Sequence, residues 1–549
     1  MSESRVLDLR PLQPPAGRGR YMTEMDRRAF SRGAAAVVLA ARLSGRLAAS
    51  GMENPPKFST ENRTWQAAYN RALDVLSAHV QILPRFEAPV LIEGANYAGI
   101  WQECGPHESL VYRLFRPDVA RNAHLIFFAL QREDGQIPAN NKATETGFGQ
   151  IQMVVPIAAT ALELARATGD EELLRKAYAG CSRWDDWLLR YRNTRRTGLV
   201  EGFCTYDTGH DNSPRWAGMP NQCPEKDARL CPQAAGLPRL CPDLSATVYG
   251  ARVALAQMAK ALGRNADADR WTEAAEAIRR LILARLFVED DAAFYDLDAN
   301  DKFIRIRSDL LSRVCGEHVV DQKQFELLWE RQIHNPRSFW AIYPLPSIAL
   351  DDPAFIRPIP RNSWGGASQA LTALRAPRWF EFYRKPAALS FLMDRWCDAI
   401  LRDGTFRQQL DPLTGIFTQA DAPNYSPAAL VLVDFTWRLA GVREEGDTLE
   451  WNIRPGHACA RGSEFSVKFA ETHRATLRYD ERAVTLSVDE RPIARFESGI
   501  ARLVTDKLGR PQSLIGISEH VETISISRDL RPSRQLILRP DEVLAFSWI

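Results

Sequence analysis

Three features are missing from this 549-residue sequence: an excess of basic charge, an apolar run long enough to cross a bilayer, and any motif for a nucleotide or a zinc ion. The 70 basic and 68 acidic residues give a formal net charge of +2, so no surplus of cations can neutralise a phosphate backbone. Nucleic acid is therefore not expected as the main partner. Because no glycine-rich phosphate loop, dinucleotide fingerprint or zinc spacing is present, no cofactor is implied.

The N-terminal region differs from the rest of the chain. Arg27-Arg28-Ala29-Phe30 precedes a small and apolar run at 33–41, and Ala48-Ala49-Ser50 follows it. The run is far shorter than the roughly 20 residues of a membrane span. This order predicts a twin-arginine signal peptide at 25–50 behind an extension at 1–24. We therefore expect a periplasmic or secreted protein that has no membrane anchor after cleavage.

At 61.9 kDa the chain is too long for one compact core, so several domains or a large toroid are expected. The segment 151–167 is almost entirely apolar and ends before Gly169, and the next stretch carries apolar residues on one face only. The same alternation recurs at 244–262 and in the stretch that follows. A helix that is apolar all round is buried, whereas a helix with one apolar stripe lies outside. Residues 55–442 are therefore predicted to form an (α/α)6 toroid, a six-hairpin barrel.

After residue 442 the apolar period changes from helical to alternating. Phe465, Val467 and Phe469 alternate with polar residues, and similar short runs follow. Alternation of this kind is typical of strands with one buried face. Residues 447–549 are therefore predicted to form an antiparallel β-sandwich domain.

The densest group of polar and aromatic residues lies at 205–216, in a long connection between two predicted hairpins. Its string Gly-x-Asp-Asn-Ser-Pro-Arg-Trp resembles the signature around the general acid of glycoside hydrolase family 63 and the related mannosylglycerate hydrolases, and trehalases carry a looser version. The resemblance covers about residues 95–442. It implies an (α/α)6 barrel, an inverting mechanism and an oligosaccharide or glycoside substrate.

An inverting glycosidase needs one carboxylic acid to protonate the leaving oxygen and a second carboxylate to activate water. By its position in the matched string, Asp211 resembles the acid. Asn212 and Arg215 are predicted to orient its carboxyl or to bind sugar hydroxyls, and Trp216 to wall the site. Two alternatives stay open: Arg215 could instead close the loop through a salt bridge, and Asp207 either binds substrate or braces the loop.

The second carboxylate is where the sequence departs from the family. The position that resembles the family's base holds Gln408, and an amide cannot act as a general base. Glu103, Glu108 or Glu381 could take the role. The enzyme could instead be a phosphorylase, or the protein could bind glycans without catalysis. We favour Glu103, which follows Trp101 ahead of the first inner helix; the alternative is a carboxylate that stabilises the helix dipole.

Further residues are candidates because they stand at hairpin ends. The predicted substrate-binding residues of this kind are Trp101, Glu108, Gln150, Asp243, Asn362, Trp364, Gln408 and Tyr425. The resulting hypothesis is an exo-acting glycosidase for an α-linked glucoside or mannoside. A polysaccharide lyase is the rival enzyme class, because Tyr206, His210, Asn212 and Arg215 supply its residue types within ten positions.

Two other patterns are interpreted as structural. Cys223, Cys231 and Cys241 lie close together among nine cysteines, with spacings that fit no zinc ribbon. They could form a disulfide in an oxidising compartment or remain free thiols. Residues 296–300 begin like a calcium loop, but the later glycine and glutamate of that motif are absent, so a turn is expected.

Overall fold

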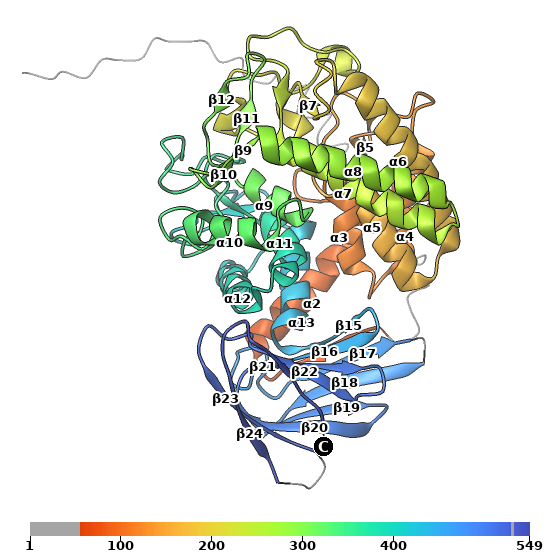
Figure 1. Ribbon diagram of the computed structural model, residues 1–549. Coiled ribbons are helices and arrows are strands. Elements are labelled where there is room, and N and C mark those ends of the chain that lie inside the picture. The colour runs from red at the N-terminus through yellow and green to blue at the C-terminus, as the bar shows by residue number, and fades with distance from the viewer. Residues whose placement is uncertain (1–54, 471, 529–531, 549) are drawn as a thin grey trace, which may run out of the picture. The chain divides into compact units, whose positions relative to one another are not determined.

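The computed structural model describes residues 55–470, 472–528 and 532–548 (Figure 1). The predicted extension at 1–24 and signal peptide at 25–50 lie outside these residues. Among the described residues, no helix is long and apolar enough to cross a membrane.

The N-terminal part of the described chain is mainly helical, as its apolar periodicity predicts. Its helices are α2 (Arg63–Ala78), α3 (Gly105–Tyr112), α4 (Pro117–Ala129), α5 (Ile157–Thr168), α6 (Glu171–Tyr191), α7 (Pro242–Ala261), α8 (Asn265–Arg285), α9 (Leu310–Gly316), α10 (Gln322–Leu328), α11 (Ala370–Phe382), α12 (Pro386–Asp403) and α13 (Ser426–Ala440).

Local signals set several of these boundaries. Gly169 ends α5 in the left-handed conformation at φ +67°, and the Asp170 side chain accepts the Leu173 amide to begin α6. The prediction that one helix runs from 151 to 167 was wrong at its start, because α5 begins only at Ile157. Pro156 caps the helix and disfavours helical geometry in the residue before it. Gln150 therefore lies in a connection and does not open the helix.

Alternate helices form a ring. α3, α5, α7, α9, α11 and α13 contact one another in this order, and α13 also contacts α3. α4, α6, α8 and α12 each pack on the ring helix before them. The burial pattern agrees, since α13 is buried on nearly all sides whereas α8 buries only one face. The two types of helix in the sequence thus correspond to ring helices and covering helices.

Short strands connect the helices near the ends of the ring. They are β2 (Val80–Ile82), β3 (Pro89–Leu91), β4 (Gly99–Trp101), β5 (Asn140–Lys142), β6 (Thr146–Gly147), β7 (Glu201–Gly202), β8 (Arg239–Leu240), β9 (Phe287–Val288), β10 (Ala293–Phe294), β11 (Asp296–Leu297), β12 (Phe303–Ile304), β13 (Ser368–Gln369) and β14 (Gln409–Leu410). They pair as β2-β3, β4-β5-β6, β12-β11-β8-β7, β10-β9 and β13-β14.

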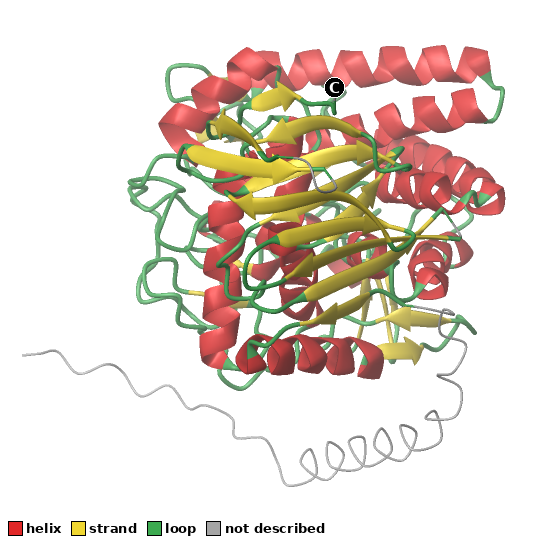
Figure 2. Ribbon diagram, turned by 90° about the horizontal axis from the view of Figure 1, so that it is seen from below, coloured by secondary structure: helices red, strands yellow, loops and turns green. Residues whose placement is uncertain are grey.

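The C-terminal part consists of two antiparallel sheets (Figure 2). The five-stranded sheet has the order β15 (Val442–Glu445), β16 (Thr448–Ile453), β21 (Ala501–Asp506), β22 (Pro511–Ile515) and β25 (Val543–Ala545). The seven-stranded sheet has the order β1 (Lys57–Ser59), β17 (Glu464–Phe469), β18 (His473–Tyr479), β19 (Val484–Val488), β20 (Arg491–Ser498), β23 (Glu522–Ser527) and β24 (Arg534–Leu538).

The strand region joins the helices at α13, which packs on β15 and β16. Phe465, Val467 and Phe469 of β17 are buried, as their alternation predicts. The strands begin at Val442, a few residues before the expected boundary, and β1 from the N-terminal side pairs with β17. That pairing joins two distant parts of the chain, so local periodicity carries no sign of it.

Candidate active site

Most of the predicted site residues lie in connections that enter the ring helices, whereas Glu108 lies in α3 and Asp243 in the first turn of α7. Glu103 precedes α3, Gln150 precedes α5, Asp211 lies between α6 and α7, and Asn362 and Gln408 precede α11 and α13. Hydrogen bonds join these connections to each other: the Trp364 amide donates to the Asp211 carbonyl, and the Tyr97 hydroxyl to Gln408. The fold therefore gathers them at one end of the ring.

The loop at 205–216 presents Asp211. It turns through Gly209 at φ +64° and Asn212 at φ +56°, a region that glycine and asparagine tolerate. The Asp211 carbonyl accepts the Trp364 amide at 3.0 Å, and its Oδ2 lies 3.5 Å from the Asn362 amide nitrogen. Asn212 donates to the Asn362 carbonyl at 2.8 Å. The connection at 362–364 thus contacts both the backbone and the carboxyl of Asp211.

The environment of Asp211 favours a protonated carboxyl near neutral pH. Close packing raises its pKa to about 7, the charge of Glu103 adds to the rise, and the hydrogen bond from Asn362 opposes it. The side chain keeps some exposed surface, so it remains open to a substrate. A carboxyl of this kind can donate a proton where an ordinary aspartate cannot.

Asp207 is buried and braces the loop. Its Oδ2 accepts the amides of Phe203 and Cys204, and its Oδ1 accepts the Ile151 amide at 2.9 Å. Both oxygens are occupied, so the geometry favours a brace over a sugar ligand.

Arg215 is the centre of a buried ionic network. Its guanidinium donates twice to Asp243 and twice to Asp296, at 2.7–2.8 Å, and once more to Nδ1 of His210. Only 1% of the side chain is exposed. These contacts saturate the guanidinium, so the geometry favours the salt-bridge interpretation of Arg215. Asp243, predicted as a substrate-binding residue, is buried and pairs with Arg215 through both carboxylate oxygens. Trp216 is also buried and donates its indole N–H to Thr208, which places it beneath the loop.

His210 connects this network to α9. Burial and the nearby Arg313 lower its pKa to about 4, so its imidazole is neutral at neutral pH. Nδ1 accepts from Arg215, and Nε2 lies 2.9 Å from Asp309. Asp296 and Asp309 were not identified as site residues from the sequence, where Asp296 was interpreted as part of a turn and Asp309 stands in no motif. His210 was noted only for the lyase alternative.

Glu103 lies directly against the loop that carries Asp211. A Cβ atom at Gly209 would stand 1.8 Å from Oε2 of Glu103, so only glycine fits at that position. Burial raises the pKa of Glu103, whereas Arg375, Arg313 and a hydrogen bond from Gln152 favour its charged form. The Arg375 guanidinium also donates to the Glu103 carbonyl at 3.0 Å. The two catalytic candidates are thus neighbours.

Two glutamines extend this side of the site. The Gln150 amide donates to Gln152 at 2.8 Å, and Gln222 donates to Gln150 at the same distance. Gln150 therefore acts on Glu103 only through Gln152.

Buried groups fill the ring beneath the site. Ligand atoms of Glu93, Cys104 and Glu108 lie within 4.8 Å of one another, and the Tyr425 hydroxyl donates to Glu93 at 2.5 Å. Burial raises the pKa of Glu93 well above its usual range and that of Glu108 to about 7. Protonated carboxyls account for this cluster. A second group among the described residues, Cys241 with Asp243 and Asp296, also has the spacing of metal ligands. Its two carboxylates are instead paired with the Arg215 guanidinium.

Gln408 occupies the position that resembles the family's base. Its Oε1 accepts from the Tyr97 hydroxyl at 3.1 Å and from Gln419 at 3.2 Å, and its Nε2 donates to Asn362 at 3.3 Å. Asn362 also contacts Asp211, so one side chain separates position 408 from the proposed acid.

Aromatic rings border the site. Trp101 packs edge-on against Tyr97 at 5.6 Å, and Trp364 lies in one cluster with Trp101 and Cys104. Trp101 is partly exposed, whereas Trp364 is 97% buried against His210 and Arg313. Trp101 is therefore the tryptophan that a sugar ring could reach.

Glu381 is engaged elsewhere. Arg502 of β21 donates to both of its carboxylate oxygens at 2.7 and 2.8 Å, in the strand region of the protein. Of the three carboxylates considered as a base, Glu103 is the one that contacts the Asp211 loop.

All nine cysteines are free thiols. Cys223 and Cys231 lie 3.7 and 4.0 Å from the buried Arg192 guanidinium. Asp298 accepts the amides of Asn300 and Lys302 within the β11–β12 hairpin, so the segment forms the expected turn.

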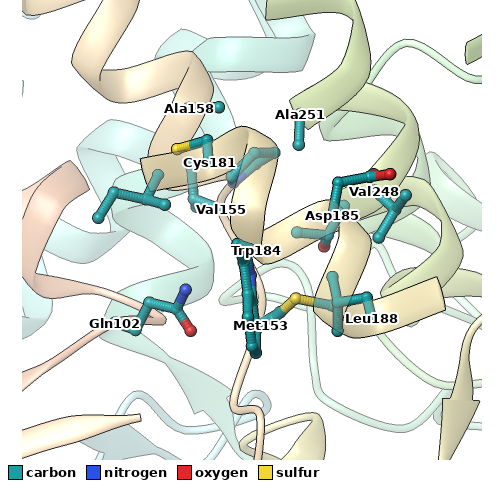
Figure 3. A pocket seen from close by; sticks show the side chains of 13 residues that line it. Gln102, Met153, Val155, Ala158, Cys181, Trp184, Asp185, Leu188, Val248 and Ala251 are labelled. Carbon is teal, nitrogen blue, oxygen red and sulfur yellow. The ribbon is translucent and has the colours of Figure 1, made fainter. Parts of the chain in front are cut away.

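A separate small pocket lies between α5, α6 and α7 (Figure 3). Its lining is largely apolar, and its one carboxylate, Asp185, is paired with Arg252 at 2.8 Å. Gln102 and Met153 reach it, whereas their neighbours Glu103 and Gln152 are paired with each other. The cavity lacks the converging polar groups of a sugar site.

Comparison with known proteins identifies one family. Residues 97–426 match the mannosylglycerate hydrolase MGH1-like glycoside hydrolase domain. No curated protein matches the chain.

Solved structures share the fold at low sequence identity. A sialidase superposes with a TM-score of 0.59 at 18% identity over 82% of this chain, which spans 41% of that protein's length. A GH63 mannosylglycerate hydrolase from Thermus thermophilus, in complex with Tris, gives 0.55 at 18% identity over 67% of this chain and 100% of the other. A GH78 family rhamnosidase of Bacillus sp. GL1 gives 0.54 at 12% identity over 79% and 41%.

Proposed function

Because this chain belongs to the mannosylglycerate hydrolase MGH1-like glycoside hydrolase family and is therefore a glycosidase, as its sequence predicts, we propose that it is an inverting enzyme with Asp211 as general acid. The observation that carries the proposal is the Asp211 carboxyl, whose pKa of about 7 keeps a proton available beside the Glu103 carboxylate. The closed ring of α3, α5, α7, α9, α11 and α13 supports an (α/α)6 barrel.

Asp211 and Glu103 divide the work of inversion. Asp211 gives its proton to the glycosidic oxygen as the bond to the anomeric carbon breaks. Glu103 takes a proton from a water molecule, and the oxygen of that water attacks the anomeric carbon from the opposite face. Arg375 and Arg313 favour the charge that Glu103 needs before this step. Trp101 offers a partly exposed face on which a sugar ring can stack.

The buried side chains next to the site support an exo mode of action. The buried side chains of Glu93, Cys104, Glu108 and Tyr425 fill the ring there. A glycan chain cannot thread past them, so only a chain end can reach Asp211. The α-linked glucoside or mannoside remains our proposal from the resemblance of the loop at 209–216.

A lyase is less well supported by the same geometry. A lyase needs an arginine that neutralises a uronate and a histidine or tyrosine that takes a proton. Here Arg215 is saturated by Asp243 and Asp296, and His210 is buried between Arg215 and Asp309.

The product's configuration tests the proposal. Proton NMR of a fresh digest of aryl α-glucosides and α-mannosides should show the β-anomer first, because inversion converts an α-bond into a β-product. The rate should not depend on added phosphate. An α-anomer first, a sugar phosphate or an unsaturated product that absorbs ultraviolet light would each contradict it.

Glu103→Gln should lower kcat/KM by about 10²–10⁴, since an amide cannot take the proton from water. It should also move the alkaline limb of the pH profile to lower pH, because the charge of Glu103 raises the pKa of Asp211. Glu145→Gln is the matched control, because the Glu145 side chain is 38% exposed at the surface. It should leave kcat/KM and the pH profile unchanged. A Glu103→Gln enzyme with wild-type kcat/KM would remove Glu103 as the base.

A further inference from the structure

The amide of Gln408 is held in one orientation by the groups around it. The Tyr97 hydroxyl and Gln419 Nε2 both donate to Oε1, which uses its two lone pairs. The NH2 group is thereby turned toward Asn362 and donates to its Oδ1 at 3.3 Å. Gln408 is also 95% buried, so water does not compete for these positions.

The orientation of Gln408 determines which end of the Asn362 amide faces Asp211. A carboxamide has one accepting end and one donating end. Since Oδ1 of Asn362 accepts from Gln408, its Nδ2 faces Oδ2 of Asp211 at 3.5 Å. The backbone of Asn362 is fixed independently, because its carbonyl accepts from Asn212. The group at position 408 therefore decides which end of Asn362 meets the carboxyl.

We propose that Gln408 is a positioning residue, which by donating to Asn362 holds the asparagine with its NH2 group, and not its carbonyl oxygen, toward the Asp211 carboxyl. The inference deepens the proposed function and rests on it, because it concerns the residue assigned there as the acid. Gln408 touches no reacting atom and acts only through Asn362.

A glutamate at position 408 would reverse the arrangement. A carboxylate can only accept, so Asn362 would have to turn its NH2 group toward position 408 and its Oδ1 toward Asp211. Asp211 would then need a proton to make a hydrogen bond to Asn362. A donor facing the carboxyl favours its charged form, whereas an acceptor favours its protonated form. Gln408 thus makes Asp211 a stronger acid than a glutamate in its place would.

Other charged groups act on Asp211 and set the background for this effect. Glu103, from the connection before α3, raises the pKa of Asp211. Glu93, Tyr97 and Tyr206 are near enough that Asp211 in turn raises theirs. A substitution at position 408 leaves the hydrogen bonds of Glu103, Glu93 and Tyr206 in place, but it changes the hydrogen bond of the Tyr97 hydroxyl, which donates to Gln408.

The test measures the pKa of Asp211 in the full chain without substrate. Aspartate labelled with ¹³C at the carboxyl carbon is titrated by NMR, and the signal absent from Asp211→Asn is assigned to Asp211. Gln408→Met keeps the length but removes the donor and should raise the pKa by about half a unit to one unit, the size of one neutral hydrogen bond. Gln408→Glu should raise it further, since it adds a like charge.

Two further variants keep the result interpretable. Asn362→Ala should raise the pKa of Asp211 like Gln408→Met, and the double variant should add little, because both changes act through the donation from Asn362 Nδ2 to Asp211. Gln322→Met, on the exposed first turn of α10, is the matched control and should leave the pKa unchanged.

The outcomes separate this inference from the proposed function. If the pKa of Asp211 stays at the wild-type value in Gln408→Met and Gln408→Glu, the positioning role is overturned, whatever happens to the rate. Faster hydrolysis by Gln408→Glu without a pKa shift would likewise overturn it and mark position 408 as a vacant base position. If Asp211→Asn hydrolyses like the wild type, the assignment of the acid fails, while the NMR titration still decides whether Gln408 positions Asn362.

Discussion

Asp211→Asn is expected to lower kcat/KM for a glycoside with a poor leaving group by about 10²–10⁴, because asparagine has no proton to give to the leaving oxygen. The asparagine has nearly the same shape, and the Asp211 carbonyl that accepts from Trp364 is unchanged, so the loop should keep its fold. The kcat/KM of Asp211→Asn for a glycosyl fluoride should fall far less, since fluoride departs without a proton from the enzyme. The measurement is kcat/KM for both substrates with one enzyme preparation.

The comparison of the two substrates separates catalysis from folding. Asp421→Asn, which removes a carboxylate 59% exposed and paired with Arg361, is the matched control and should behave like the wild type on both. Equal losses on both substrates would indicate that Asp211 only shapes the site. Unchanged hydrolysis of the poor substrate would place the acid elsewhere.

The fold could be predicted to the extent that it depends on local apolar periodicity. The contrast between the apolar segment that becomes α7 and the amphipathic α8 indicates which helix faces inward, because burial repeats every turn. The pairing of β1 with β17 was not predicted, since it joins residues about 400 positions apart and no local pattern specifies a partner. The early start expected for α5 was wrong because the apolar residues of the sequence continue into the irregular, non-helical segment before Pro156.

The candidate site was predicted where residues stand next to each other in the loop at 205–216. The parts that were missed are contacts over long distances. Arg215 meets Asp296 of β11 and Asp243 of α7, and Glu103 meets Arg375 of α11. A sequence shows that these charges exist but not which of them pair. The structure thereby changes the interpretation of Arg215 from a possible sugar ligand to the centre of a buried network.

This network explains how a partly exposed loop can hold Asp211 in place. The loop consists of turns and short 3-10 segments, so its internal backbone hydrogen bonds join only residues that are three positions apart. Asp207 ties its first half to the connection before α5, and Arg215 ties its second half to α7 and β11. Asp211 lies between these two ties. The position of its carboxyl therefore depends on buried charges that do not touch the substrate.

Arg215→Met is expected to destabilise the protein by about 3–5 kcal/mol, because it leaves Asp243 and Asp296 buried without their partner. The midpoint of urea unfolding, followed by tryptophan fluorescence, should fall accordingly. Arg229→Met is the matched control: its pair with Asp227 is 41% exposed at the arginine, so the same substitution should cost only about 0–1 kcal/mol.

A second change distinguishes unpaired charge from lost packing. Arg215→Met combined with Asp296→Asn removes one of the two buried carboxylates that have lost their ion-pair partner. It should therefore recover part of the stability, whereas a loss of packing would not be reversed. Both Arg215 variants should also hydrolyse glycosides poorly, since the second tie of the Asp211 loop is gone. An Arg215→Met protein as stable as Arg229→Met, with wild-type activity, would show that the loop is held by its other contacts alone.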